Sequence, residues 1–363
     1  MNKKRILLLL LVTAILGALI YLQFRTWQKF DWRTFAHVTK DLNWKLIAVA
    51  VLIIYVTYVL RALRWKIFLR PVCDADFKSM LGPQFIGFTG LALLGRPGEL
   101  IRPYLIAKKE NLTFSSQVAV WAVERIFDIG AFAVLMAIDV FAFSGTFSIP
   151  ANFYVSAHLW KINFSVRFVV LLMIFGVFLL GAVAFMAWAA YKIRSNTTGV
   201  ANWLEGKIAV ISKNLASAVC HKVRAFGAGL NTIHDRRAFT QLTFVSLLIW
   251  LLIALAYFTI LSCYPKSMQP QDVLLLMGAS MVGSLLQLPA VGGGSQLATI
   301  GVMWKVFSFP QEQAVSAGIM LWLVTFVTCV PVGLIFARFE HVSLRKVSAE
   351  TQHEEQGAEA LEN

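Results

Sequence analysis

Three charged residues, Arg96, Glu99 and Arg102, stand on a turn between two apolar stretches. The turn reads Gly-Arg-Pro-Gly-Glu-Leu-Ile-Arg-Pro at 95–103. Glycine and proline permit a sharp turn and limit the helix on either side of it. Glu99 and Arg102 are three residues apart, so they share a face on any helical turn. The sequence therefore predicts a turn that presents cations and an acid together.

A second group of charges, Glu124, Arg125 and Asp128, lies inside the next apolar stretch. Their spacing places them on adjoining faces of a helix. A guanidinium in a membrane cavity is a fixed cation whose planar donor fork suits a phosphate. The acids could orient it, hold a cationic headgroup or carry protons. The alternative is a structural salt-bridge cluster that pins the turn to the helix, for example Arg102 to Glu124 or Arg96 to Asp128.

A glycine run at 292–294 follows Pro289 and precedes Gln296. Its consecutive backbone N–H groups could bind a phosphate, and a tight turn alone is the alternative. These glycines and the two charged groups form the predicted substrate-binding set: Arg96, Glu99, Arg102, Glu124, Arg125, Asp128, Gly292, Gly293, Gly294 and Gln296.

The composition places these residues in a membrane. Hydrophobic residues make up 58% of the 363-residue chain and charged residues 14%, whereas a soluble domain carries about 25% charged residues. A water-soluble enzyme is therefore excluded. The net charge of +14 could suggest nucleic-acid binding, but the basic residues lie between long apolar runs, so we expect no nucleic-acid partner.

Apolar runs predict an all-α integral membrane protein with six full transmembrane helices in one domain, 1–347, because a bilayer core needs roughly 20 helical residues. The expected spans are Ile6–Phe24 as an uncleaved anchor, Leu46–Leu60 with a snorkelling Arg61, Val118–Phe143, Phe168–Tyr191, Ala238–Tyr264 and Ala314–Ala337. The distribution of Lys and Arg predicts that both termini are cytoplasmic. The amphipathic basic segment 192–237 is expected on the anionic inner leaflet, or packed under the bundle. Residues 348–363 read as an acidic disordered tail.

Two apolar segments have the wrong length for one span. Within 79–108 the uncharged run Met80–Leu94 has only 15 residues, which is too short for a span. Within 272–309 the uncharged run Val273–Trp304 has 32 residues, which is longer than one span but shorter than two spans with a turn. We expect two re-entrant hairpins of opposite orientation, which some methods would count as spans seven and eight; two interfacial loops are the alternative. A shift of 196 residues pairs glycines 87 and 98 with 283 and 294, and Gln117 with Gln313. Together with the opposite orientation, this predicts an inverted repeat, which transporters use to build a site from broken helices.

The four cysteines and six histidines show no paired spacing, and no Walker loop, dinucleotide fingerprint or nucleophile elbow occurs. We therefore expect no metal, no cofactor and no catalytic residue.

The motif at 95–103, the later Glu124-Arg125-x-x-Asp128 and the turn 289–296 resemble the lysylphosphatidylglycerol synthase/flippase transmembrane family. The resemblance covers about 40–340 and implies a flippase-like, multi-pass protein of the bacterial-type cytoplasmic membrane. It implies the translocase part without the soluble aminoacyltransferase domain, and hence no enzyme activity. Gln296 stands where the family usually has Glu. The resemblance therefore does not carry over to Gln296 a role that needs a negative charge at this position.

The expected function is to bind or translocate a polar, phosphate-bearing lipid between leaflets. The expected partners are a membrane phospholipid or lipid-linked substrate and, beside it, a partner enzyme. One alternative is a proton-coupled transporter of a small solute, with Glu99, Glu124 or Asp128 as proton site. Another is a membrane subunit that presents lipid to a partner enzyme and moves nothing itself.

Overall fold

The computed structural model describes residues 30–143, 146–148, 154–159, 162–208, 220, 236–284, 293–340 and 342. The predictions for Ile6–Phe24, for the tail 348–363 and for most of 192–237 lie outside these residues. Within the basic segment, α8 (Thr197–Ile208) is described and is helical.

Four helices are long and apolar enough to cross a membrane. They are α3 (Trp44–Leu69), α6 (Phe114–Phe143), α10 (Arg236–Leu261) and the continuous stretch Gln311–Phe339. The last consists of α13 (Gln311–Trp322), the π-helical turn η3 (Leu323–Val327) and α14 (Cys329–Phe339). A further helix, α7 (Phe168–Ser195), coincides with the predicted span at 168–191. The chain is therefore built as a multi-pass membrane protein.

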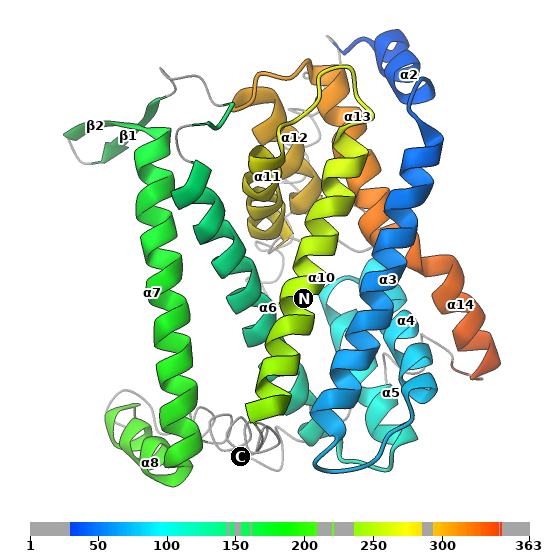
Figure 1. Cartoon of the computed structure of the whole chain (residues 1–363), viewed down its shortest axis with the longest axis vertical. Helices are drawn as coiled ribbons and strands as arrows, with labels where there is room; N and C mark the ends of the chain where they lie inside the picture. The colour runs from blue at the N-terminus through cyan, green and yellow to red at the C-terminus, as the bar shows by residue number, and fades with distance from the viewer. Residues whose placement is uncertain are drawn as a thin grey trace, which may run out of the picture.

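The connection between α6 and α7 departs from the all-α prediction. It contains two antiparallel strands, β1 (Tyr154–Leu159) and β2 (Ile162–Arg167). The strands are rich in β-branched and aromatic residues, which favour extended backbone, and two residues separate them, the usual length of a hairpin loop. The chain between the two helices therefore forms a small β-hairpin at one end of the molecule (Figure 1).

Helical hairpins form at both positions that were predicted to be re-entrant. The first consists of α4 (Phe77–Leu94), the 3₁₀ turn η1 (Arg96–Leu100) and α5 (Ile101–Lys109); the second consists of α11 (Pro270–Gly283) and α12 (Gly293–Lys305). In each hairpin the two arms pack against each other. The two hairpins lie toward opposite ends of the molecule (Figure 1). Their insertion into a bilayer and the orientation of the chain stay predictions.

Glycine allows the arms of both hairpins to touch near their tips. A Cβ added to Gly98 would lie 2.2 Å from the backbone oxygen of Gly90, and one added to Gly283 would lie 2.2 Å from the backbone oxygen of Gly294. Both distances are far below van der Waals contact. The first tip also turns at Gly95, whose φ of 71° favours glycine. Close packing of the arms near each tip therefore requires glycine.

The order of elements repeats. A long helix, a hairpin and a second long helix occur once as α3–α4–α5–α6 and again as α10–α11–α12–α13. Helices α3 and α10 pack side by side and run in opposite directions (Figure 1). The paired glutamines are both buried: Gln117 accepts a hydrogen bond from the Trp65 indole (3.1 Å), and Gln313 donates one to the Lys266 carbonyl (2.6 Å). Each glutamine thus ties the helix after a hairpin to the segment before it, as an inverted repeat would.

The π-helical turn η3 interrupts the last long helix where α3 crosses it. The Tyr58 hydroxyl donates to the Thr325 carbonyl (2.9 Å), and the Tyr55 hydroxyl donates to the Thr328 carbonyl (2.6 Å). These bonds satisfy carbonyl groups whose regular helical partners are displaced by the extra residue of a π turn. Two tyrosines of the first repeat therefore hold the bend in the second.

Alanine substitutions test the packing of the hairpin tips. We expect Gly98→Ala and Gly283→Ala each to lower the free energy of unfolding by about 1–3 kcal/mol, because the added methyl forces the arms apart. Gly130→Ala on α6 is the matched control, since its Cβ would meet nothing within 4 Å. Thermal unfolding in detergent measures the effect. Equal melting temperatures for all three variants would contradict the packing described.

Candidate functional site

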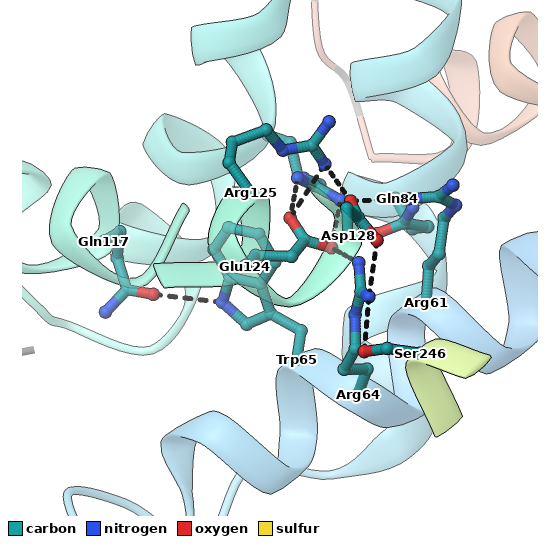
Figure 2. Close-up of polar contacts among 10 residues, drawn as sticks. Arg61, Arg64, Trp65, Gln84, Gln117, Glu124, Arg125, Asp128 and Ser246 are labelled. Carbon is teal, nitrogen blue, oxygen red and sulfur yellow. Dashed lines mark hydrogen bonds and ion pairs between the residues drawn. The ribbon is translucent and has the colours of Figure 1, made fainter. Parts of the chain in front are cut away.

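A buried cluster of charged side chains lies where α3, α5 and α6 meet (Figure 2). Ion pairs join four arginines to Glu124 and Asp128. The arginines are Arg61, Arg64, Arg102 and Arg125. Since burying a charge without a partner is costly, these pairs are what allows arginines to enter an otherwise apolar helix bundle.

Arg64 of α3 lies at the centre of this cluster and is completely buried. Its Nη2 donates to Glu124 Oε1 (2.6 Å), while its Nη1 donates to Asp128 Oδ1 (2.7 Å) and to the Ser246 hydroxyl (2.9 Å). One guanidinium therefore connects α3 to two turns of α6 and to α10.

Arg102 brings the first hairpin into the cluster. Its Nη2 forms an ion pair with Glu124, its Nη1 donates to Gln84 Oε1 (3.2 Å), and its guanidinium carbon lies 4.3 Å from the centre of the Trp65 ring. Close approach of α5 to α4 at this point depends on Gly87, where an added Cβ would lie 2.5 Å from the Arg102 Cβ. The pair Arg102–Glu124, given above as an example of a structural salt bridge between turn and helix, is therefore present.

Asp128 forms ion pairs with the remaining two arginines, Arg61 and Arg125. Arg61 Nη1 lies 3.4 Å from Asp128 Oδ2, and Arg125 Nη2 lies 3.0 Å from the same oxygen and 3.3 Å from Glu124 Oε2. The Arg125 side chain is 36% exposed, whereas the side chains of Arg61, Arg64 and Arg102 are at most 9% exposed. Arg125 is therefore the cation of the cluster that can meet a ligand from outside.

A small cavity of about 30 Å³ lies beside the cluster and has room for roughly one or two waters. Its lining combines charged groups from the hairpin and α6 with apolar side chains: Gly87, Phe88, Leu91, Glu99, Arg102, Trp121 and Arg125. Glu99 thus reaches the cavity, as its spacing from Arg102 predicts.

Several donors in the cluster have no acceptor among the residues that the structure describes. Arg64 Nε, Gln84 Nε2 and Arg125 Nε are buried and make no hydrogen bond there. An unsatisfied buried donor costs about 1–3 kcal/mol, and of these three residues Arg125 lines the cavity, so a ligand with an acceptor for Arg125 would be stabilised here. Four guanidinium groups against the carboxylates of Glu99, Glu124 and Asp128 also leave one positive charge in excess. The cluster is therefore suited to an anion.

The structure brings together only part of the predicted set. Glu99, Arg102, Glu124, Arg125 and Asp128 share one site, as the positions and contacts above show. The side chain of Arg96 and all of Gly292 lie outside the described residues. Gly293, Gly294 and Gln296 begin α12 in the other hairpin. Among the described residues, no hydrogen bond or ion pair joins these three to the arginine cluster.

Arg61 and Arg64 were missed by the sequence analysis, and the prediction that Arg61 snorkels is wrong. Helix α3 continues to Leu69, so Arg61 lies within the helix, where acids of α6 compensate its charge. A signal was present: Arg61 and Arg64 are three apart, and Glu124 and Asp128 are four apart, so each pair occupies one helical face.

Loss of Arg64 tests its structural role. We expect Arg64→Gln to destabilise the protein by about 3–5 kcal/mol, because two carboxylates lose their central partner while staying buried. Arg70→Gln is the matched control on the same helix end: Arg70 is exposed and, among the described residues, its side chain bonds only to Gln241, and surface changes stay within about 0.5 kcal/mol. Thermal unfolding in detergent measures both. Similar melting temperatures for the two variants would contradict the role of Arg64.

Sequence comparison relates the chain to a known family and to a known protein. The family described as the lysylphosphatidylglycerol synthase TM region matches residues 6–333. A 111-residue segment is also 32% identical to glycosyltransferase AglD of Haloferax volcanii, covering 30% of this chain and 18% of that protein. With the match to the family extending over most of its length, the chain belongs to the lysylphosphatidylglycerol synthase transmembrane-region family.

Proposed function

We propose that this protein binds a polar lipid through its phosphate and moves it between the two leaflets of a bacterial-type cytoplasmic membrane. The observation that carries this function is the excess of guanidinium groups over carboxylates beside a cavity, together with the unfilled Nε donor of Arg125, a residue that lines the cavity. A phosphate supplies both the negative charge and the acceptors that are missing there.

Arg125 and Arg102 are the two guanidinium groups that line the cavity. Arg125 is the more exposed of the two, and it is held from behind by Asp128. An arginine fixed in this way presents its free edge without losing much side-chain entropy on binding. We assign first contact with the phosphate to Arg125 and the deeper contact to Arg102.

Glu99 faces the same cavity from the hairpin tip. A carboxylate there would repel a bare phosphate but would attract the amine of a headgroup that carries both charges. Glu99 would therefore select among phosphate-bearing lipids, and Gln296, which lies in the second hairpin, would take no part in that contact.

The apolar part of the cavity lining suits a lipid. Phe88, Leu91 and Trp121 stand beside the arginines, and neighbouring side chains on the same helices, Leu93 on α4 and Ile129 on α6, are 37% and 46% exposed. Acyl chains could thus remain outside while the headgroup enters. Because the cavity holds only about two waters, entry of a headgroup requires the first hairpin to move relative to α6.

The partial similarity to a glycosyltransferase favours a second candidate, a subunit that presents a lipid to an enzyme without moving it. The same anion site would serve that purpose. Translocation distinguishes these two candidates, because only the first moves lipid between leaflets. A proton-coupled transporter of a small solute differs from both, because its substrate is not a lipid.

Reconstitution in liposomes tests translocation directly. We expect fluorescently labelled phosphatidylglycerol to cross between leaflets faster than in empty vesicles, and labelled glucosylceramide, which is polar but has no phosphate, to cross at the background rate. Arg125→Gln should reduce the rate for phosphatidylglycerol at least about tenfold, since a charge-assisted hydrogen bond is worth roughly 1.5–3 kcal/mol. Accessibility of the label to a membrane-impermeant quencher measures the rate.

Arg70→Gln is the control for loss of a positive charge away from the cavity, and it should transport at the wild-type rate. Glu99→Gln should alter the preference between phosphatidylglycerol and an amine-bearing phospholipid. An unchanged rate in Arg125→Gln would exclude the assigned contact. Binding of phosphatidylglycerol without any translocation would favour the lipid-presenting subunit.

A further inference from the structure

Arg61 is the least firmly held arginine of the cluster. Its Nη1 lies 3.4 Å from Asp128 Oδ2, and among the described residues this is its only hydrogen bond or ion pair. Arg64, in contrast, makes three hydrogen bonds, at 2.6, 2.7 and 2.9 Å. The Arg61 side chain is only 9% exposed, and a guanidinium carries about five N–H donors. Arg61 is therefore a largely buried cation, most of whose donors have no acceptor in the described part of the chain.

The aromatic ring of Phe88 on α4 connects Arg61 to the wall of the cavity. The guanidinium carbons of Arg61 and Arg102 lie over this ring, at 5.4 Å and 5.6 Å from its centre. Phe88 and Arg102 line the cavity, whereas Arg61 is not one of the lining residues. The ring of Tyr58, one turn before Arg61 on α3, lies 4.8 Å from the Phe88 ring, centre to centre. Phe88 is therefore the part of the cavity wall that stands next to Arg61.

The acids that pair with Arg102 and Arg61 show in which direction Arg61 lies. Arg102 pairs with Glu124, and Arg61 pairs with Asp128, which is four residues, or about 6 Å, further along α6. Asp128 is the fifteenth of the 30 residues of this membrane-length helix. Buried charges at such a depth are costly and are typical of substrate or ion pathways. Arg61 therefore marks a cation position near the middle of α6.

We propose that Arg61 is an inner binding position for the lipid phosphate, and that the Phe88 ring is the gate between this position and the cavity. The inner position rests on the proposed function and extends it by one step. A phosphate that has met Arg125 and Arg102 moves on to Arg61 when the ring rotates away. There it accepts hydrogen bonds from donors that the described protein leaves without an acceptor, and it remains paired with a positive charge.

Binding of a phosphate would itself loosen the gate. A cation is attracted to an aromatic face because the face carries partial negative charge. A phosphate paired with Arg102 compensates the positive charge of this guanidinium and weakens its attraction to the Phe88 ring. A phenylalanine side chain has no polar atom that could hold it in place by a hydrogen bond. The ring is therefore held closed while the cavity is empty and is released when the cavity is filled.

The alternative role of Phe88 is packing alone, and Phe85 represents that role on the same helix. Phe85, one turn before Phe88, stacks on Phe336 with the ring centres 5.6 Å apart. It does not line the cavity, and no guanidinium in the described part of the chain lies over its ring. Phe85→Leu therefore removes a ring from α4 without opening the gate, and it is the matched control for Phe88→Leu.

Chemical modification of arginine tests the gate without any transport assay. Purified protein in detergent is treated with phenylglyoxal, and the modified arginines are identified by peptide mass spectrometry. We expect Arg61 to react slowly in wild type and in Phe85→Leu, and several-fold faster in Phe88→Leu. Completely buried Arg64 and exposed Arg70 give the slow and the fast limit in each sample. An unchanged rate at Arg61 in Phe88→Leu would overturn the gate, and so would an equal acceleration at Arg64, which would assign the ring to packing.

Protection by a short-chain lipid tests the inner position itself. In Phe88→Leu, we expect dihexanoyl phosphatidylglycerol to slow the modification of both Arg61 and Arg125, and dihexanoylglycerol, which has no phosphate, to slow neither. Protection of Arg125 without protection of Arg61 would reject the inner position and leave the proposed function intact. Absence of protection at both arginines would reject the phosphate contact of the proposed function, and the inner position with it.

The liposome assay separates the inner position from the outer one. We expect Arg61→Gln to lower the translocation rate of labelled phosphatidylglycerol at least about tenfold, because the phosphate loses its charged partner midway. The lipid should still protect Arg125 in this variant, and Arg61→Lys, which keeps the charge, should retain part of the rate. A wild-type rate in Arg61→Gln would overturn the inner position. Loss of protection at Arg125 in Arg61→Gln would also overturn it, because Arg61 would then serve only to hold the outer site together.

Discussion

The ion pairs of Arg64 with Glu124 and Asp128 are the contact on which this structure depends. Arg64 is fully buried, and an unpaired guanidinium in such a place costs several kcal/mol. Its partners lie one turn apart on α6, so α3 and α6 can be docked in only one register. Because Ser246 of α10 joins the same guanidinium, the contact also fixes the long helix that begins the second repeat.

The same acids then place the other arginines. Glu124 contacts Arg64, Arg102 and Arg125, and Asp128 contacts Arg61, Arg64 and Arg125. Each carboxylate is thus shared by three guanidinium groups, and none of the arginines receives a full negative charge of its own. The structural and functional interpretations of the cluster are therefore compatible: the acids hold the arginines rigid, and the shortage of acids leaves the arginines able to bind an anion.

The sequence predicted the part of this arrangement that depends on local spacing. Glu99 and Arg102, and Glu124 with Asp128, are set on one face by the helical period, and the hairpin positions follow from run lengths and glycines. The contribution of α3 could not be obtained in that way. Its uncharged run stops at Leu60, and only the acids of α6, a tertiary partner, explain why the helix continues with two arginines inside the protein. The β-hairpin was missed because the chain between α6 and α7 was considered only as a loop between spans.

The two repeats share a scaffold and differ in charge. Both hairpins close on glycine contacts, Gly98 against α4 and Gly283 against Gly294, and both are followed by a helix anchored through a buried glutamine. The first hairpin, however, places Arg102 against α6, where Glu124 pairs with it, whereas the second hairpin carries a buried acid, Asp272, in the first turn of α11. The repeated order of elements thus places the arginine cluster beside the first hairpin, and a movement of that hairpin against α6 separates Arg102 from Glu124 and changes the electrostatic environment of the remaining arginines.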